Sequence, residues 1–174
     1  MYETLRLFHV SEDPNISVFH PRLPRRPELD PNVGLVWSLT EPSLPNWLFP
    51  RACPRVGFRL CGQTTEADRA RFFTSAQHVV AIEQGWHARQ AAHTLYVYEF
   101  APTNFYFDKV AGFYVSQQPE TPIGMVTYTD LYAELFRRGA EVRLVDNLWP
   151  LRDAVLASSL TVWSFCKMAN AQPR

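Results

Sequence analysis

The sequence predicts an α+β fold, in which a single compact domain has mostly antiparallel strands and two or three short helices. Its 174 residues suit one domain, which at this size can bury about 70% of the surface of the unfolded chain. Short runs rich in β-branched and aromatic residues recur along the chain, whereas few segments have helical spacing. The 14 prolines outnumber the 7 glycines, which is typical of proline-rich loops between short elements.

The first third of the chain is expected to alternate strands with loops. Its apolar runs predict three strands, over residues 4–10, 34–40 and 55–60. Two proline-rich segments predict extended loops, over residues 13–33 and 41–54. The second of these loops has room for one helical turn. The polar residues 61–70 that follow indicate a turn.

The central segment predicts a strand, a helix and a second strand. RFFT, residues 71–74, has the composition of a short strand. Ser75 can cap a helix over residues 76–92, on which apolar residues form a partial stripe. TLYVYEF, residues 94–100, is rich in aromatic and β-branched residues and predicts a strand.

The last part of the chain predicts further strands and two helices. Strand-like runs cover residues 104–110, 111–117, 140–145 and 160–165. Leu131 and Leu135 have helical spacing, Thr129 or Asp130 can cap that helix, and Gly139 can end it.

The chain is expected to close with a short helix and a tail. NLWPLRDAVLAS, residues 147–158, predicts a helix with Pro150 in its first turn, where proline is tolerated because its missing N–H has no helical partner. Residues 167–174 are mostly polar and predict a tail outside the regular elements.

Charge and cysteine content exclude several classes of protein. The 17 basic and 17 acidic residues cancel, so no broad surface for duplex nucleic acid or an acidic membrane is expected. No apolar run approaches the ~20 residues of a membrane helix. Cys53, Cys61 and Cys166 form no CxxC pair, and with no signal peptide they favour reduced thiols in a cytoplasmic protein. Their spacing to His78 or His87 fits no standard zinc pattern, so no metal is expected.

Polar side chains directly follow the first predicted strand, in LFHVSEDP. The neutral imidazole of His9 offers one donor and one acceptor, a pair that suits the diol of a ribose. The alternative is a histidine whose hydrogen bonds are satisfied by local backbone. Ser11 fits a site and a turn cap equally well, whereas a turn is the better interpretation of Asp13.

Arginines beside proline in the predicted loops are candidates for a phosphate site. They are Arg22, Arg51 and Arg55. A guanidinium can engage two oxygens of a diphosphate at once, and scaffolded loops often carry such contacts. Arg51 is the strongest of the three because its neighbours are apolar. The alternative is a set of solvated loop arginines or internal carboxylate pairs.

Two of these segments resemble the ADP-ribosyltransferase-like fold, in the branch with a histidine on the first strand. LFHVS resembles its first motif, which implies split β-sheets, NAD as the bound substrate, and an adenosine ribose anchored by His9 and Ser11. RFFTSAQHVVAIEQGW followed by LYVYEF resembles its second block, in which a strand ending in Thr-Ser leads into a helix beside the nicotinamide pocket. This block implies pocket roles for Phe73, Ser75 and Tyr98.

The third motif of that fold is a glutamate, or sometimes another polar residue, on a late strand. It stabilises the ribosyl oxocarbenium ion that forms as nicotinamide leaves. FYVSQQPET offers Gln118 and Glu120 for this role, and AEVRLV offers Glu141. A neutral amide at Gln118 would stabilise less charge and would favour binding over transfer to protein. Glu83 is a further candidate base, but a solvated position on the predicted helix is the better interpretation.

Nearly the whole chain also resembles an uncharacterised bacterial family known only as a domain of unknown function. The matching phrases include LFHVSEDP, VWSLTE, FPRACPRV and LWPLRDAVLASSL. This resemblance implies one compact domain and brings no activity with it.

Three functions therefore stay open at the level of sequence. The first is an NAD-dependent ADP-ribosyltransferase-like protein that binds NAD or a related nucleotide in a cleft at the end of the first strand, with an unidentified acceptor. The second keeps this fold without the chemistry, as a binding module for a nucleotide or a nucleic-acid end. The third is an unrelated small-molecule hydrolase or an interaction protein.

Overall fold

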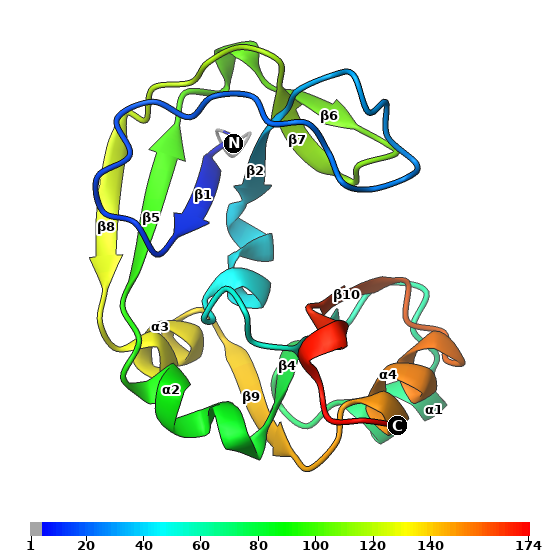
Figure 1. Cartoon of the computed structure of the whole chain (residues 1–174). Coiled ribbons are helices and arrows are strands. Elements are labelled where there is room, and N and C mark those ends of the chain that lie inside the picture. Colours follow the sequence, from blue (N-terminus) through cyan, green and yellow to red (C-terminus); the bar gives the residue numbers. More distant parts are fainter. Residues whose placement is uncertain (1–4) are drawn as a thin grey trace. The chain divides into compact units, whose positions relative to one another are not determined.

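The computed structural model describes residues 5–174, which fall into two compact units (Figure 1). The first unit combines the segment ending at Leu44 with Leu95–Tyr128, and the second combines Pro45–Thr94 with Thr129–Arg174. Each unit has one β-sheet and the strands are mostly antiparallel, which confirms the predicted α+β class. The single domain expected from chain length stays a prediction, and residue 4, the expected start of the first strand, lies outside the described residues.

An antiparallel sheet of six strands forms the first unit. The strand order is β6-β7-β2-β1-β5-β8. The strands are β1 (Leu7–Ser11), β2 (Val36–Thr40), β5 (Leu95–Phe100), β6 (Tyr106–Asp108), β7 (Phe113–Ser116) and β8 (Gly124–Tyr128). A single 3-10 turn, η3 (Pro102–Asn104), joins β5 to β6. Gly112, in the tight turn between β6 and β7, has a positive φ of 73°, a conformation that glycine adopts without steric cost.

A mixed sheet of four strands forms the second unit, with the order β10-β3-β4-β9. The strands are β3 (Arg55–Arg59), β4 (His78–Glu83), β9 (Ala140–Val145) and β10 (Val162–Cys166). Only β4 and β9 run parallel. The α-helices are α1 (Glu66–Phe72), α2 (His87–Ala91), α3 (Leu131–Arg137) and α4 (Trp149–Leu156), and the 3-10 segments are η2 (Gln84–Trp86) and η4 (Met168–Asn170). A further 3-10 segment, η1 (Glu41–Trp47), begins in the first unit and ends in the second.

Helices α1 and α4 cover one face of the four-stranded sheet. Phe72 from α1 and Val155 from α4 join a cluster of buried sheet residues that includes Val56, Phe58 and Val79. Phe58 is fully buried and meets the Phe72 ring edge to face, with the ring centroids 5.7 Å apart. Burial of large apolar side chains of this kind stabilises the unit by roughly 1.5–3 kcal/mol for each side chain.

The predicted helix over residues 76–92 is wrong. Strand β4 occupies its first half, and all six residues of β4 are buried. A central strand that is buried on both faces loses the alternation of polar and apolar residues, so its apolar run can be mistaken for one face of a helix. Only the five residues of α2 are α-helical in that range, and Ser75 lies in the turn before β4 instead of capping a helix.

The turn predicted over residues 61–70 holds only for the residues before Glu66, and the strand predicted over residues 71–74 is wrong. Helix α1 begins at Glu66 and ends at Phe72, and the Thr65 hydroxyl caps it by accepting a hydrogen bond from the Asp68 N–H. A short helix of this kind depends on its cap and on tertiary contacts more than on its own propensity. With α1 included, the described residues contain four α-helices where two or three were expected.

The other predicted elements are confirmed, with two additions. Helix α3 is capped by Asp130 and followed by Gly139, and α4 carries its proline in the first turn. Strand β8 was not predicted. Its residues Met125 and Val126 pair with β5 at the edge of the sheet, and a 3-10 turn, η4, forms inside the predicted polar tail.

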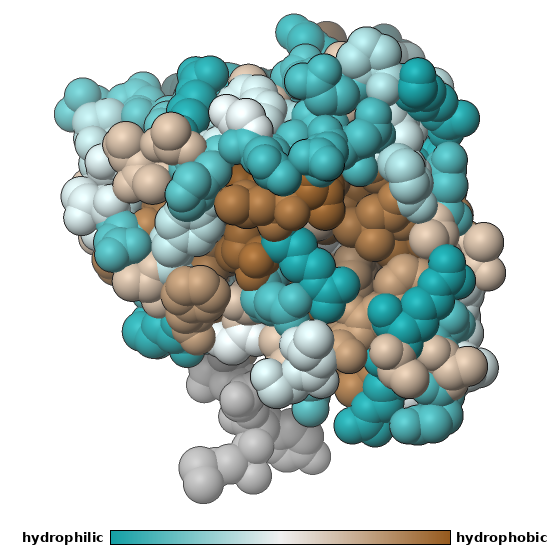
Figure 2. Space-filling view, turned by 90° about the horizontal axis from the view of Figure 1, so that it is seen from below, coloured by the Kyte–Doolittle hydropathy of each residue, from teal (hydrophilic) through white to brown (hydrophobic). Residues whose placement is uncertain are grey.

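Some hydrophobic residues remain at the surface. On the face shown in Figure 2 they form the brown areas, with hydrophilic residues in teal around them. In the first unit, the exposed ones include Phe107 on β6 and Val126 on β8. Within the described part of the chain, no helix has the length and apolar character needed to span a membrane.

Candidate functional site

Strand β1 places His9 on the face of the six-stranded sheet that also carries Tyr98. Side chains alternate along a strand, so Leu7, His9 and Ser11 share this face. His9 lies directly opposite Tyr98 of β5 in the antiparallel register. Ser38 of β2 belongs to the same face, because Leu7 pairs with Thr40 two positions further along β2.

A hydrogen bond and a ring contact help to hold the imidazole of His9. Its Nδ1 lies 2.9 Å from the carbonyl oxygen of Trp37. A carbonyl can only accept, so Nδ1 carries the proton and Nε2 is the acceptor nitrogen of the neutral ring. The Phe19 ring lies over the imidazole, with a centroid distance of 4.8 Å. The orientation and the tautomer of His9 are therefore both fixed by the fold.

The Tyr98 hydroxyl fastens the loop after β1 to this face. It accepts a hydrogen bond from the Ile16 N–H at 3.2 Å and donates one to the Asp13 carbonyl at 2.7 Å. The Ser11 hydroxyl accepts from the Asp13 N–H, and the Asp13 carboxylate accepts from the Asn15 N–H. Ser11 and Asp13 therefore cap successive turns of the loop, which is the local role predicted for Asp13.

Glu120 is tied to the same face by two contacts. Ser116, at the end of β7, donates a hydrogen bond to the Glu120 carboxylate at 2.5 Å. The backbone of Glu120 pairs with that of Phe19 through two hydrogen bonds, and Phe19 is the residue that covers His9. Glu120 and Ser116 are both buried, whereas the Gln118 side chain is exposed. Of the two late candidates, Glu120 is the one whose side chain the fold holds in place.

The remaining predicted residues belong to other segments of the chain. Arg22 exchanges two backbone hydrogen bonds with Leu35, and its side chain is exposed. Arg51, Phe73 and Ser75 belong to the second unit, where Phe73 packs edge to face on Phe58. Their roles in a nucleotide pocket stay predictions.

The second block of the resemblance has a different local structure from the one it implied. In this chain helix α1 comes first, Thr74 and Ser75 form the turn, and strand β4 follows.

Arg55 is buried, and donates to the carbonyls of Asn46 at 2.5 Å and of Cys53 at 2.9 Å. It has the role of a structural arginine inside the second unit.

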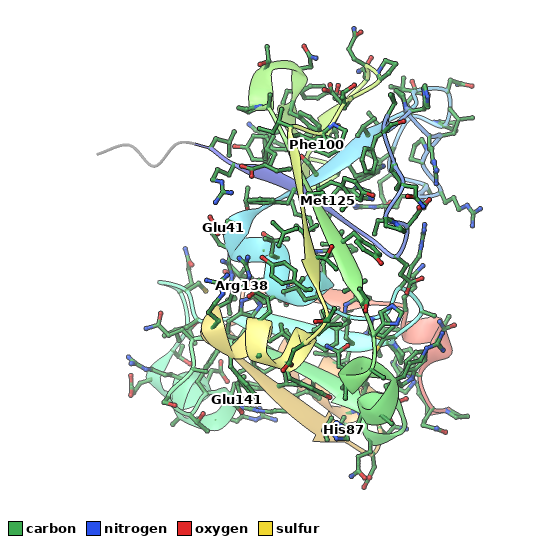
Figure 3. All side chains as sticks on the ribbon, turned by 90° about the vertical axis from the view of Figure 1, so that its left-hand side faces the viewer. Glu41, His87, Phe100, Met125, Arg138 and Glu141 are labelled. Atoms are coloured by element: carbon green, nitrogen blue, oxygen red, sulfur yellow. The ribbon has the colours of Figure 1, made fainter. Side chains whose placement is uncertain are left out.

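The two other carboxylates considered as candidate acids lie in the second unit. Glu141 of β9, labelled in Figure 3, accepts hydrogen bonds from Thr74 at 2.6 Å and from Arg143 at 2.6 Å. These bonds hold the pKa of its carboxyl below the usual value, with Arg143 the largest cause. Glu83 ends β4 and is buried, so its predicted position on a solvated helix is wrong.

Sequence reasoning missed three residues on the His9 face of the sheet. Ser38 and Ser116 are buried polar side chains on strands, and Phe19 lies in a loop with no periodic pattern. The only signal available was the polar position of each serine within an apolar strand run. Phe19 gives no such signal, because its partner Glu120 lies far away in the sequence.

Two cysteines of the second unit differ in the ionisation of their thiols. Burial raises the pKa of Cys53 to about 12. Hydrogen bonds from the hydroxyls of Thr161 and Thr64, each 3.3 Å from Sγ, lower the pKa of the partly exposed Cys61 to about 6. Within residues 5–174, no group of three or more His, Cys, Asp or Glu side chains is arranged to hold a metal ion.

Cys61 is expected to be the first thiol alkylated by iodoacetamide in the folded protein. The thiolate is the reactive form, so the rate of its alkylation should fall as the pH is lowered through about 6. Thr161→Val removes the hydrogen bond that lowers the pKa of Cys61 most. The pH at which the alkylation rate falls should therefore move upward. Mass spectrometry over a pH series measures both, and Cys61→Ser identifies the modified site. Equal labelling of Cys53 in the folded protein would contradict the assignment.

Comparison with known proteins adds a family match to this geometry. The model of a family described as "Family of unknown function (DUF6886)" matches residues 8–171. No curated protein and no solved structure matches the chain.

Proposed function

We propose that this chain, which belongs to the family of unknown function DUF6886, binds NAD or a related nucleotide on the His9 face of its six-stranded sheet and cleaves it as ADP-ribosyltransferase-like proteins do. The observation that carries the proposal is the common face of His9, Tyr98 and the Ser116–Glu120 pair. All of these residues belong to the first unit, so the proposal depends on that unit alone.

The fixed tautomer of His9 suits the anchoring of a ribose. The hydrogen bond from Nδ1 to the Trp37 carbonyl selects the tautomer in which Nε2 is an acceptor, the kind of group that matches a ribose hydroxyl. A side chain whose rotamer is already fixed loses little further entropy when a ligand binds. The aromatic ring of Phe19 beside the imidazole offers an apolar wall for the sugar or base.

Glu120 supplies the charge for the chemical step. When the bond between nicotinamide and the ribose breaks, both electrons leave with nicotinamide and positive charge develops on the ribosyl carbon. A carboxylate held in place by Ser116 stabilises that charge without having to reorganise. Water or another acceptor oxygen then attacks the ribosyl carbon and loses its proton, which completes the transfer.

Binding without turnover is the second candidate function. Glu120 is only 7% exposed, and its carboxylate already accepts the Ser116 hydrogen bond. A carboxylate that keeps this hydrogen bond would help to shape a binding site but would not stabilise the ribosyl cation. Loss of nicotinamide from bound NAD separates the two functions.

His9→Ala is expected to abolish the thermal stabilisation of the protein by NAD and ADP-ribose. A ligand at 100 times its dissociation constant adds about 2.7 kcal/mol, and each kcal/mol moves the unfolding midpoint of a domain of this size by roughly 2–4 °C. Wild type should therefore show a clear shift that the variant lacks. His20→Ala is the matched control, because His20 lies in the same loop region and its side chain is exposed.

Nicotinamide release is measured on the same samples. If the chemical proposal holds, wild type releases nicotinamide steadily, and Glu120→Gln keeps the thermal shift but loses the release. Saturable binding of intact NAD over a long incubation would favour the binding module. Absence of a shift with NAD, ADP-ribose and nicotinamide would refute both candidates.

A further inference from the structure

The last residues of the sequence are held by a buried carboxylate of the second unit. Glu83 is 3% exposed, and its two carboxylate oxygens accept the N–H of Gln172 at 2.9 and 3.1 Å. The N–H of Leu148 lies 3.4 Å from the same carboxylate. Within residues 5–174 no arginine, lysine or histidine forms an ion pair with Glu83. Its charge is therefore balanced by backbone donors, one of which comes from the tail.

Two further side chains bind the backbone of this tail. The indole N–H of Trp149 donates to the Gln172 carbonyl at 2.9 Å, and the amide of Asn147 donates to the Pro173 carbonyl at 2.8 Å. The side chains of Glu83, Trp149 and Asn147 thus bind three backbone groups of the tail. These groups are the N–H and the carbonyl of Gln172 and the carbonyl of Pro173. A segment held by backbone groups in an extended form is what peptide-binding sites recognise.

One side chain of the tail is also recognised. The guanidinium of Arg174 lies 4.5 Å from the centre of the Trp149 ring, within the range of a cation–π contact. It also donates to the Asp153 carboxylate at 3.4 Å. The site therefore combines backbone contacts that tolerate many sequences with a preference for an arginine at one position.

We propose that Glu83, Asn147, Trp149 and Asp153 form a binding site for an extended peptide that carries an arginine, and that residues 170–174 occupy it. The partner that we propose is a second copy of this chain. Its residues 170–174 would occupy the site in place of the chain's own segment. Lys167, which has a left-handed φ of 54°, precedes the tail and provides a point at which its direction can change. Because the tethered segment always stays close to the site, a second copy competes only when that segment is released or removed.

The direct test uses a variant that lacks residues 170–174 and a fluorescent peptide of residues 168–174. The truncated protein should bind the peptide saturably, and the intact chain should bind it at least tenfold more weakly. Methylating the backbone nitrogen of Gln172 in the peptide removes the hydrogen bond to Glu83 and should weaken binding at least tenfold. Replacing Arg174 of the peptide by Gln should weaken binding to the truncated protein several-fold and reduce the salt dependence of binding. A scrambled peptide that binds equally well to the folded truncated protein would overturn the proposal, as would no binding at all.

A second measurement works on the full chain and does not require the truncated variant to fold. Trypsin can cut after Lys167 once the tail opens, so the rate of this cut reports release of the tail. The cut should be at least tenfold faster in Trp149→Phe, which loses the indole donor, and unchanged in Trp163→Phe, whose ring is exposed on β10. An excess of the peptide of residues 168–174 should accelerate the cut in the wild-type chain, and the N-methylated peptide should not. Equal rates under all of these conditions would refute the site.

Discussion

Gly57→Ala is expected to destabilise the second unit by about 2–4 kcal/mol, because overpacking and a lost buried hydrogen bond add together. Gly57 lies in the middle of β3, where it pairs with Val80 and Ser164 on its two sides. A Cβ atom at this position would overlap the Oδ1 of Asn46 and lie 2.8 Å from its Cγ. Asn46 cannot easily turn away, since the same Oδ1 accepts a hydrogen bond from the buried His78 at 2.8 Å.

The comparison variant is Gly62→Ala. A Cβ at Gly62 meets no atom within 4 Å, so this change should leave stability within about 0.5 kcal/mol of wild type. Chemical denaturation of both variants gives the two free energies of unfolding. In an Asn46→Ala background the cost of Gly57→Ala should become much smaller, because the overlapping atom is gone. An undiminished cost in that background would show that Asn46 is not the cause.

Most strands could be predicted from sequence because their residues carry the signal themselves. The runs around Val36, Phe58 and Val142 are rich in β-branched or aromatic residues and are bounded by loop residues, as expected for strands. The helix over residues 76–92 could not be excluded in this way. HVVAIE is buried on both faces between β3 and β9, and an apolar run of that length has no period that separates a strand from a helix.

Helix α1 depends on contacts with residues far away in the sequence, which a local sequence pattern does not reveal. The Asp68 carboxylate in its first turn accepts hydrogen bonds from both the N–H and the hydroxyl of Ser159, which follows α4. The Thr65 cap was visible in TTEADRARF, but the polar composition of that segment favoured a turn. A capping residue followed three positions later by an acidic residue was the stronger signal in this case.

Some residues of the candidate site were proposed from sequence, but their arrangement was not. His9 and Glu120 were proposed because their segments resemble the first and third motifs of the ADP-ribosyltransferase-like fold. Their connection through Phe19 depends on an isolated pair of backbone hydrogen bonds, which no local pattern encodes. The tail site shows the same limit, because a polar segment outside regular structure gives no sign that Glu83 binds it.

The second unit is also expected to lose stability in acid because of one buried histidine. His78 is 7% exposed, and burial, with a smaller contribution from the charge of Arg59, lowers its pKa to about 4 from an ordinary value of 6.5. Arg59 lies directly opposite His78 in the register of β3 and β4. The neutral ring donates its Nε2 proton to Asn46, a hydrogen bond that does not require the imidazole to be charged.

The sign of this effect follows from the number of protons bound in each state. Between pH 6.5 and pH 4 the unfolded chain binds a proton at His78 and the folded chain does not, so acid favours unfolding. Each unit of pH in this window costs up to 1.36 kcal/mol, which amounts to about 3 kcal/mol over the window. Above pH 6.5 the residue is neutral in both states and contributes no pH dependence.

His78→Gln isolates this contribution, because the amide keeps a donor for Asn46 and does not titrate. Free energies of unfolding measured from pH 7 to pH 4 should fall less steeply in this variant than in wild type, with the two curves differing by about 3 kcal/mol in their total change. His20→Gln, at an exposed loop histidine, should follow the wild-type curve. Parallel curves for wild type and His78→Gln would mean that the unit admits a charged imidazole at this position. The hydrogen bond between His78 and Asn46 would then have to open in acid while the rest of the sheet stays folded.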